Sequence, residues 1–192
     1  MVAIDINQTR LDFAKSNGFA DDVHCLPVGE RAKNAEEGLK QAKERIASAL
    51  SQFSEEEGFD VIFECTGAEP CIQMSIHVRL FLFAELLVFN PPFTFQAAIT
   101  GGKVMLIGMG SRNVLLPLST AALREVDIHG SFRYANTYPT AIELLSSGKL
   151  ENVEKLISHR MSLKESAKAF DLLSRGKDDN GNMVLKIIVG SS

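Results

Sequence analysis

The chain has 192 residues, enough for one domain of ordinary size or for one domain with an additional fragment. Hydrophobic residues make up 45% and charged residues 23%, and the net charge is −4, as in a soluble globular protein. No long lysine and arginine run is present, which argues against nucleic acid as a partner. Three cysteines without a CxxC pair argue against a disulfide framework and favour a reducing, cytoplasmic location.

Neither a signal peptide nor a membrane span is expected. Residues 2–6 read VAIDI, which is typical of a strand and not of a charged and then apolar leader. The most apolar stretch, residues 78–89, is shorter than the roughly 20 residues that a span requires. It also contains Arg79 and Glu85. We therefore expect no membrane partner.

Apolar runs and helical periodicity alternate along the chain, in a pattern typical of a parallel α/β sheet. We expect strands at 2–6, 23–28, 60–65, 104–107, 127–132 and 183–189, helices at 9–17, 32–53, 70–77, 138–147 and 163–175, and a turn at Gly101-Gly102. The strand at 60–65 is largely apolar, which predicts burial on both faces. Ligands of such sheets bind outside the carboxyl ends of the strands, which points to Asp5, Thr66, Gly108 and Phe132.

Asp5 ends the first expected strand. In a dinucleotide-binding fold, an acidic residue at the end of the second strand accepts hydrogen bonds from the adenine ribose and disfavours the 2′-phosphate of NADP. The alternatives are a turn or a helix N-cap. Arg10 would flank the same adenosine or lie free on a helix surface. The GxGxxG fingerprint normally precedes such an acid by about 20 residues, and because only four residues do so here, we expect the chain to enter the fold after its first strand.

Two glycine-containing loops are the other candidate binding elements. Gly108-Met109-Gly110 and Thr66-Gly67 would allow close approach of a ligand, or they are plain turns. The four histidines share no metal-ligand spacing with a cysteine or carboxylate. We therefore predict no metal site and no catalytic constellation, and we expect Cys65 and Cys71 to be buried apolar residues.

Several segments together resemble the sorbitol and xylitol dehydrogenases of the medium-chain zinc family. The carrying segments are LREVDIHGSFRYANTYPTAIELL (123–145), ISHRMSLKESAKAFDLL (157–173), DVIFECTGAEPCIQMSIH (60–77), GGKVMLIGMGS (101–111) and the DIN and TRL strings at 5–7 and 9–11. The tail at 175–189 is similar to the fungal xylitol dehydrogenases. The resemblance implies an incomplete Rossmann-type NAD-binding domain at 1–132, lacking its first strand, and at 133–192 a C-terminal segment that returns to the catalytic domain.

The resemblance also implies roles for individual residues. Asp5 and Arg10 would hold the adenosine ribose of NAD, and a polyol would be oxidised to a ketose. The remaining cofactor contacts would be Thr66, Ile107, Gly108, Met109, Ser131 and Phe132, with Arg133 and Tyr134 meeting the polyol. The catalytic zinc of the family comes from an N-terminal lobe, and its ligands are not found in this sequence.

One block, residues 78–96, does not fit the resemblance. Removing it joins SIH to AAITGGK and restores the helix-to-strand connection of the family. Its phenylalanine and leucine residues have pyrimidine-rich codons, and both of its ends can be encoded as splice sites. We interpret it as an intron retained in frame; a hydrophobic insertion or a partner-binding helix is the alternative.

Two functional interpretations follow. In the first, the chain is a truncated, inactive product of a polyol dehydrogenase gene. In the second, it is a non-catalytic interaction module that pairs with full-length subunits, or a homo-oligomer, through the region around residues 104–130.

Overall fold

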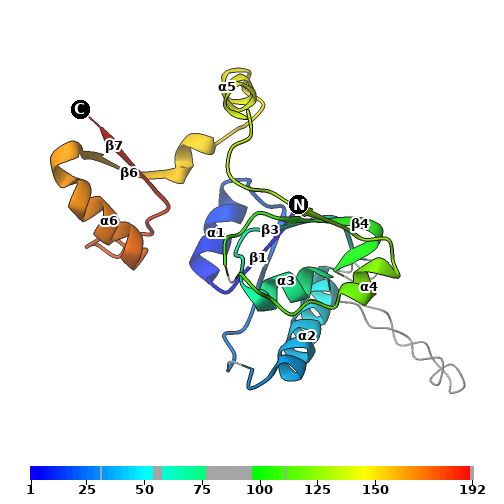
Figure 1. Cartoon of the computed structure of the whole chain (residues 1–192). Coiled ribbons are helices and arrows are strands. Elements are labelled where there is room, and N and C mark those ends of the chain that lie inside the picture. Colours follow the sequence, from blue (N-terminus) through cyan, green and yellow to red (C-terminus); the bar gives the residue numbers. More distant parts are fainter. Residues whose placement is uncertain (31, 54–57, 77–96, 111, 191–192) are drawn as a thin grey trace, which may run out of the picture. The chain divides into compact units, whose positions relative to one another are not determined.

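The computed structural model describes residues 1–30, 32–53, 58–76, 97–110 and 112–190 (Figure 1). These form two compact units, one of residues 1–25 with 136–192 and one of residues 26–135. The predicted domains, 1–132 and 133–192, follow a family boundary and stay a prediction. Among the described residues, every helix is too short or too polar to traverse a lipid bilayer; the apolar stretch at 78–89 lies outside them.

The first unit opens with a β-α-β arrangement. Strands β1 (Val2–Asp5) and β2 (Asp22–Cys25) pair in parallel and are joined by helix α1 (Gln8–Ser16). The Asn7 side chain caps α1 by accepting a hydrogen bond from the Arg10 N–H. Leu11 fixes the helix to the strands and is only 2% exposed. This arrangement places the carboxyl end of β1 beside the first turn of α1.

The remainder of the first unit is built around a second strand pair. Helix α5 (Tyr138–Ser146) precedes β6 (Ile157–Ser162), α6 (Ser166–Arg175) and β7 (Lys186–Gly190), and β6 pairs in parallel with β7. Two short 3-10 helices, Val153–Leu156 and Leu163–Glu165, flank β6. Helix α6 buries Ala169 and Leu172, whereas α5 buries none of its residues. The sequence reasoning expected α5, α6 and a last strand, but not β6.

The second unit holds a three-stranded parallel sheet of order β3-β4-β5. Its elements are α2 (Ala35–Phe53), β3 (Phe59–Glu64), α3 (Glu69–Ile76), β4 (Ala98–Leu106), α4 (Leu118–Ala122) and β5 (Asp127–Gly130). Its core joins α3, α4 and the sheet through Ile72, Ile76, Ala98, Val104, Ala121 and Val126. The strand pairs β1-β2, β3-β4 and β4-β5 are all parallel, which confirms the predicted α/β class with parallel strands. Among the described residues, β1-β2 and β3-β4-β5 form separate hydrogen-bonded sheets.

Four details of the second unit correct the sequence predictions. Gly101 and Gly102 lie inside β4 and not in a turn between elements. The pairing of β3 with β4 shifts register at this point, and Gly101 has a positive φ, so the irregularity lies within the strand. Helix α4 was not expected. Cys65 is exposed, because it follows the last residue of β3. Val61 and Phe63 are 43% and 61% exposed, so β3 is not buried on both faces; it is an edge strand of the described sheet.

Arg124 joins the two ends of the connection between α3 and β4. Its guanidinium nitrogens donate to the Ile76 carbonyl at 3.0 Å and to the Ala98 carbonyl at 2.6 Å. These carbonyls belong to the last residue of α3 and the first of β4. Because a guanidinium is a small rigid fork, both ends lie next to one another. Burial lowers the pKa of Arg124, which nevertheless stays protonated.

We expect a variant lacking residues 78–96 to fold with an unchanged or higher thermal midpoint. His77 and Ala97 would then link Ile76 to Ala98, whose carbonyls already lie beside one guanidinium, and the shorter loop loses less entropy on folding. Thermal unfolding followed by circular dichroism measures this. An unfolded deletion variant would show that 78–96 belongs to the folded structure.

A pair of arginine variants tests the role of Arg124 in holding α3 and β4 together. Arg124→Ala removes two charge-assisted hydrogen bonds and should lower the free energy of unfolding by about 2–3 kcal/mol, with or without the block. Arg112→Ala, at an exposed arginine, should change it little. Equal effects of the two would contradict the role given to Arg124.

Candidate functional site

The carboxyl edge of the β3-β4-β5 sheet gathers most of the predicted cofactor residues. Thr66 follows β3, the segment Ile107 to Met109 follows β4, and Ser131 and Phe132 follow β5. The Ile107 N–H donates to the Glu64 carbonyl at 2.8 Å, and the Ser131 N–H donates to the Leu106 carbonyl at 2.9 Å. The segments after β4 and β5 are therefore each hydrogen-bonded to the last residue of the neighbouring strand, at the edge where ligands of parallel sheets bind.

Three glycines allow the loops after β3 and β4 to meet backbone to backbone. A Cβ added to Gly67 would lie 2.8 Å from the carbonyl carbon of Gly108, and one added to Gly108 or Gly110 would overlap the backbone of Gly67. Gly67 also has a φ of +70°, a conformation that glycine adopts without strain. The glycines therefore serve a close approach of the two loops to each other, and approach of a ligand to these loops stays a prediction.

Glu64, the last residue of β3, accepts hydrogen bonds from both of the loops that meet here. Its carboxylate accepts hydrogen bonds from the Thr66 N–H at 2.9 Å, from the Thr66 hydroxyl, and from the Gly67 N–H at 2.9 Å. Its backbone carbonyl accepts the N–H groups of Ile107 and Gly108. At 5% exposure the carboxylate is buried with its hydrogen bonds satisfied. Sequence reasoning missed Glu64, although a charged residue inside the apolar run DVIFEC was a usable signal.

Exposed apolar side chains border this edge. Ile107, Met109 and Phe132 are 43%, 73% and 72% exposed. The Arg133 guanidinium lies 5.1 Å from the centre of the Phe132 ring, in a cation–π contact. Arg133 has a φ of +54°, an uncommon value for a residue with a side chain. An apolar border with few polar groups is typical of a small-molecule site.

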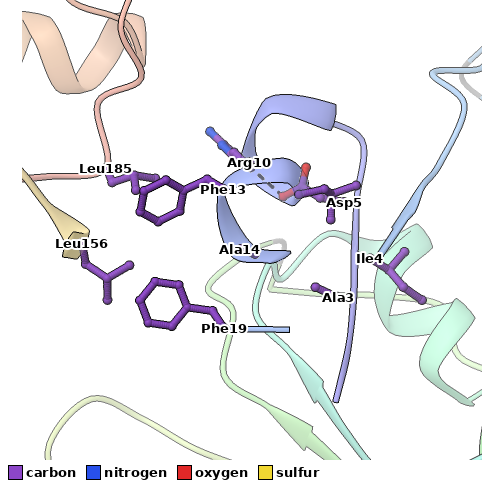
Figure 2. Close-up of a pocket in the computed structure, with 10 residues that line it drawn as sticks. Ala3, Ile4, Asp5, Arg10, Phe13, Ala14, Phe19, Leu156 and Leu185 are labelled. Carbon is purple, nitrogen blue, oxygen red and sulfur yellow. Dashed lines mark ion pairs between the residues drawn. The ribbon is translucent and has the colours of Figure 1, made fainter. Parts of the chain in front are cut away.

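Asp5 and Arg10 lie together in the first unit, beside a pocket of about 390 Å³ (Figure 2). The Asp5 carboxylate is 3.8 Å from the Arg10 guanidinium and also accepts the Asn7 N–H at 2.9 Å. Asp5 thus has the turn role that was weighed as an alternative, and its side chain remains 33% exposed. The other walls are apolar, and the rings of Phe13 and Phe19 stack with centroids 6.0 Å apart.

Arg133 and Tyr134, the predicted polyol contacts, are both exposed at the surface of the second unit. Burial raises the pKa of the Cys65 thiol, and the negative charge of the neighbouring Glu64 raises it further. No three His, Cys, Asp or Glu side chains of the described residues are placed to hold a metal ion. The residues of this chain therefore do not fit a zinc site within its described part.

We expect Gly108→Ala to lower the free energy of unfolding by about 1–3 kcal/mol, because its methyl group would overlap the Gly67 backbone. Gly130→Ala, at the end of β5, is the matched control, since nothing lies within 4 Å of its added Cβ. Urea unfolding of the two variants measures the difference. Equal stabilities would show that the loops can separate without cost.

Sequence comparison places the chain beside the polyol dehydrogenases. No family model matches it. Sorbitol dehydrogenase of Gallus gallus is 33% identical over 177 residues, which are 92% of this chain and 40% of the relative. L-Arabinitol 4-dehydrogenase of Hypocrea jecorina is 33% identical over 171 residues, 89% of this chain and 37% of the relative. The chain thus spans about 40% of the length of these relatives.

Solved structures show the same fold at lower identity. Zinc-dependent alcohol dehydrogenase 2 from Streptococcus pneumonia matches with a TM-score of 0.68 at 20% identity, covering 100% of this chain and 44% of that one. An Escherichia coli alcohol dehydrogenase solved with NADH matches with a TM-score of 0.65 at 18% identity, covering 98% and 43%. By sequence over most of its length and by fold, the chain is a homologue of the sorbitol dehydrogenases that matches about two fifths of their length.

Proposed function

We propose that this chain supplies cofactor- and substrate-facing residues of an NAD-dependent polyol dehydrogenase, whose reaction takes a polyol to a ketose. The observation that carries the proposal is the carboxyl edge of β3-β4-β5, where Thr66, Ile107 to Met109 and Ser131 to Phe132 follow three paired strands and are anchored by hydrogen bonds to Glu64 and Leu106, the last residues of β3 and β4. The names of the relatives, sorbitol and L-arabinitol dehydrogenases, support a polyol as the substrate class.

The chain's own residues would divide the work of binding between them. The exposed Asp5 carboxylate is suited to accept hydrogen bonds from ribose hydroxyls, with Arg10 beside it. The exposed Ile107, Met109 and Phe132 would cover the nicotinamide and keep water from it, while Arg133 and Tyr134 would meet the polyol hydroxyls. NAD would accept the hydride. We derive no step through zinc, because the described residues do not form a ligand set.

We further propose that the 192-residue chain alone does not turn over a polyol. In a doubly wound sheet of order 3-2-1-4-5-6, the first strand lies between the second and the fourth, and the turn after it holds the pyrophosphate. β1-β2 and β3-β4-β5 correspond in order to strands 2-3 and 4-5-6, and no described strand joins the two sheets. This supports weak binding of NAD, because none of the described strands supplies the turn that holds the pyrophosphate.

We therefore expect NAD to bind this chain more weakly than micromolar and expect no polyol-dependent NADH production. Titration followed by nicotinamide fluorescence, and an absorbance assay with sorbitol and xylitol, measure the two quantities, with an intact sorbitol dehydrogenase as the positive control. Micromolar affinity, or NADH production that a chelator abolishes, would overturn the proposed inactivity.

The alternative function is an interaction module that pairs with full-length dehydrogenase subunits. The observation favouring it is α5, whose Tyr138, Ile142 and Leu145 are 64%, 64% and 51% exposed. Large apolar side chains gathered on one exposed helix are typical of a surface that a partner covers.

This alternative predicts that the tagged chain co-purifies with an intact polyol dehydrogenase subunit. Ile142→Glu should weaken the capture, because a charge on α5 would have to be buried at the interface. Leu163→Glu, at a residue that is 66% exposed at the start of the 3-10 helix Leu163–Glu165, is the matched control, because it lies outside both α5 and residues 104–130. Absence of co-purification, or equal loss in both variants, would remove α5 as the docking surface.

A further inference from the structure

The carboxylate of Glu64 is an anion at the cofactor-facing edge with no cationic partner in the described part of the chain. Its hydrogen-bond donors there are the Thr66 N–H, the Thr66 hydroxyl and the Gly67 N–H, all of them neutral. None of the ion pairs between described residues includes it. These donors satisfy the carboxylate oxygens, but no described cation neutralises their negative charge, so a cation that docks at this edge is attracted.

The charge of Glu64 reaches the surface of this edge. Cys65 is exposed as a residue, but partial desolvation of its thiol raises the pKa of the thiol, and the negative charge of Glu64 raises this pKa further. The same carboxylate holds the Thr66-Gly67 loop, and the backbone carbonyl of Glu64 holds the Ile107-Gly108 loop. A ligand lying on these two loops would therefore lie within the field of a single negative charge.

We propose that Glu64 is a positioning and specificity-determining residue that fixes the two loops and makes this edge prefer the oxidised, cationic nicotinamide ring over the reduced, neutral one. The inference rests on the proposed function, since it takes the nicotinamide as the ligand of this edge. NAD⁺ and NADH differ at the ring by one positive charge and a hydride, so a negative charge near the ring stabilises the oxidised form relative to the reduced form. This preference needs no direct contact between the ring and the carboxylate, because the attraction between charges acts over several ångströms.

The test compares Glu64→Gln with Asp60→Asn, which removes the same charge from the opposite, exposed end of β3. Millimolar NAD⁺ and NADH are titrated into each protein, and the backbone amide signals of Thr66, Gly67 and Gly108 are followed by NMR. We expect Glu64→Gln to reduce the preference for NAD⁺ over NADH about fivefold. Asp60→Asn should leave the preference unchanged.

A second readout needs no nucleotide. The pH dependence of Cys65 alkylation, read by mass spectrometry, should move to lower pH in Glu64→Gln, with Cys25 and Cys71 as internal references. In Glu64→Ala, which lacks the acceptor oxygens as well, the Gly67 and Gly108 signals should also shift in the free protein.

The outcomes separate the two proposals. If neither nucleotide shifts these amides in the unaltered chain, the assignment of the nicotinamide to this edge fails, and the preference for the oxidised ring fails with it. If both nucleotides bind and Glu64→Gln weakens them equally, only the role of the Glu64 charge is overturned. An unchanged Cys65 profile in Glu64→Gln would likewise overturn it.

Discussion

The candidate site depends on two loops that pass each other with no side chain between them. The N–H groups of one loop turn inward to the Glu64 carboxylate, and those of the other turn to the Glu64 carbonyl. Burying a carboxylate is costly, and the cost is offset here only while the first loop keeps its shape. The hydrogen bonds and the absence of side chains at Gly67, Gly108 and Gly110 therefore require each other. The two loops therefore hold each other in place, and neither is expected to move without the other.

The rest of the described chain also exposes large apolar side chains. Val61 and Phe63 on the edge strand β3 and the apolar face of α5 are examples. The relatives are about two and a half times as long as the matching part, since that part is 40% of their length. In both functional interpretations, these exposed apolar side chains would be covered by further protein.

Local patterning predicted most of the elements, and tertiary context decided the rest. The apolar spacing of α2 predicted a helix at 32–53, and the structure has Ala35–Phe53. β6 was missed because its ISHRMS sequence mixes polar and apolar residues without regular alternation; it is a strand because it pairs with β7. The prediction for 60–65 was wrong about burial, because burial depends on which strands lie on either side and not on the apolar content of the strand itself.

The candidate site divides in the same way. The rule that ligands bind beyond the carboxyl ends of parallel strands selected Thr66, Gly108 and Phe132 from the sequence alone, and the structure places them along one edge. Glu64 could not be selected by that rule, because its part depends on hydrogen bonds to a loop 43 residues away in sequence, at Ile107.

Arg124 has a consequence for how this gene can change. By holding the end of α3 and the start of β4 together, it fixes both ends of the connection, so polypeptide encoded between them can change in length without moving either end. A splicing error or an in-frame duplication at that point would lengthen the product while sparing the packed interior, and selection on folding would not remove it. The same position would accept an epitope tag or a fluorescent reporter in the laboratory.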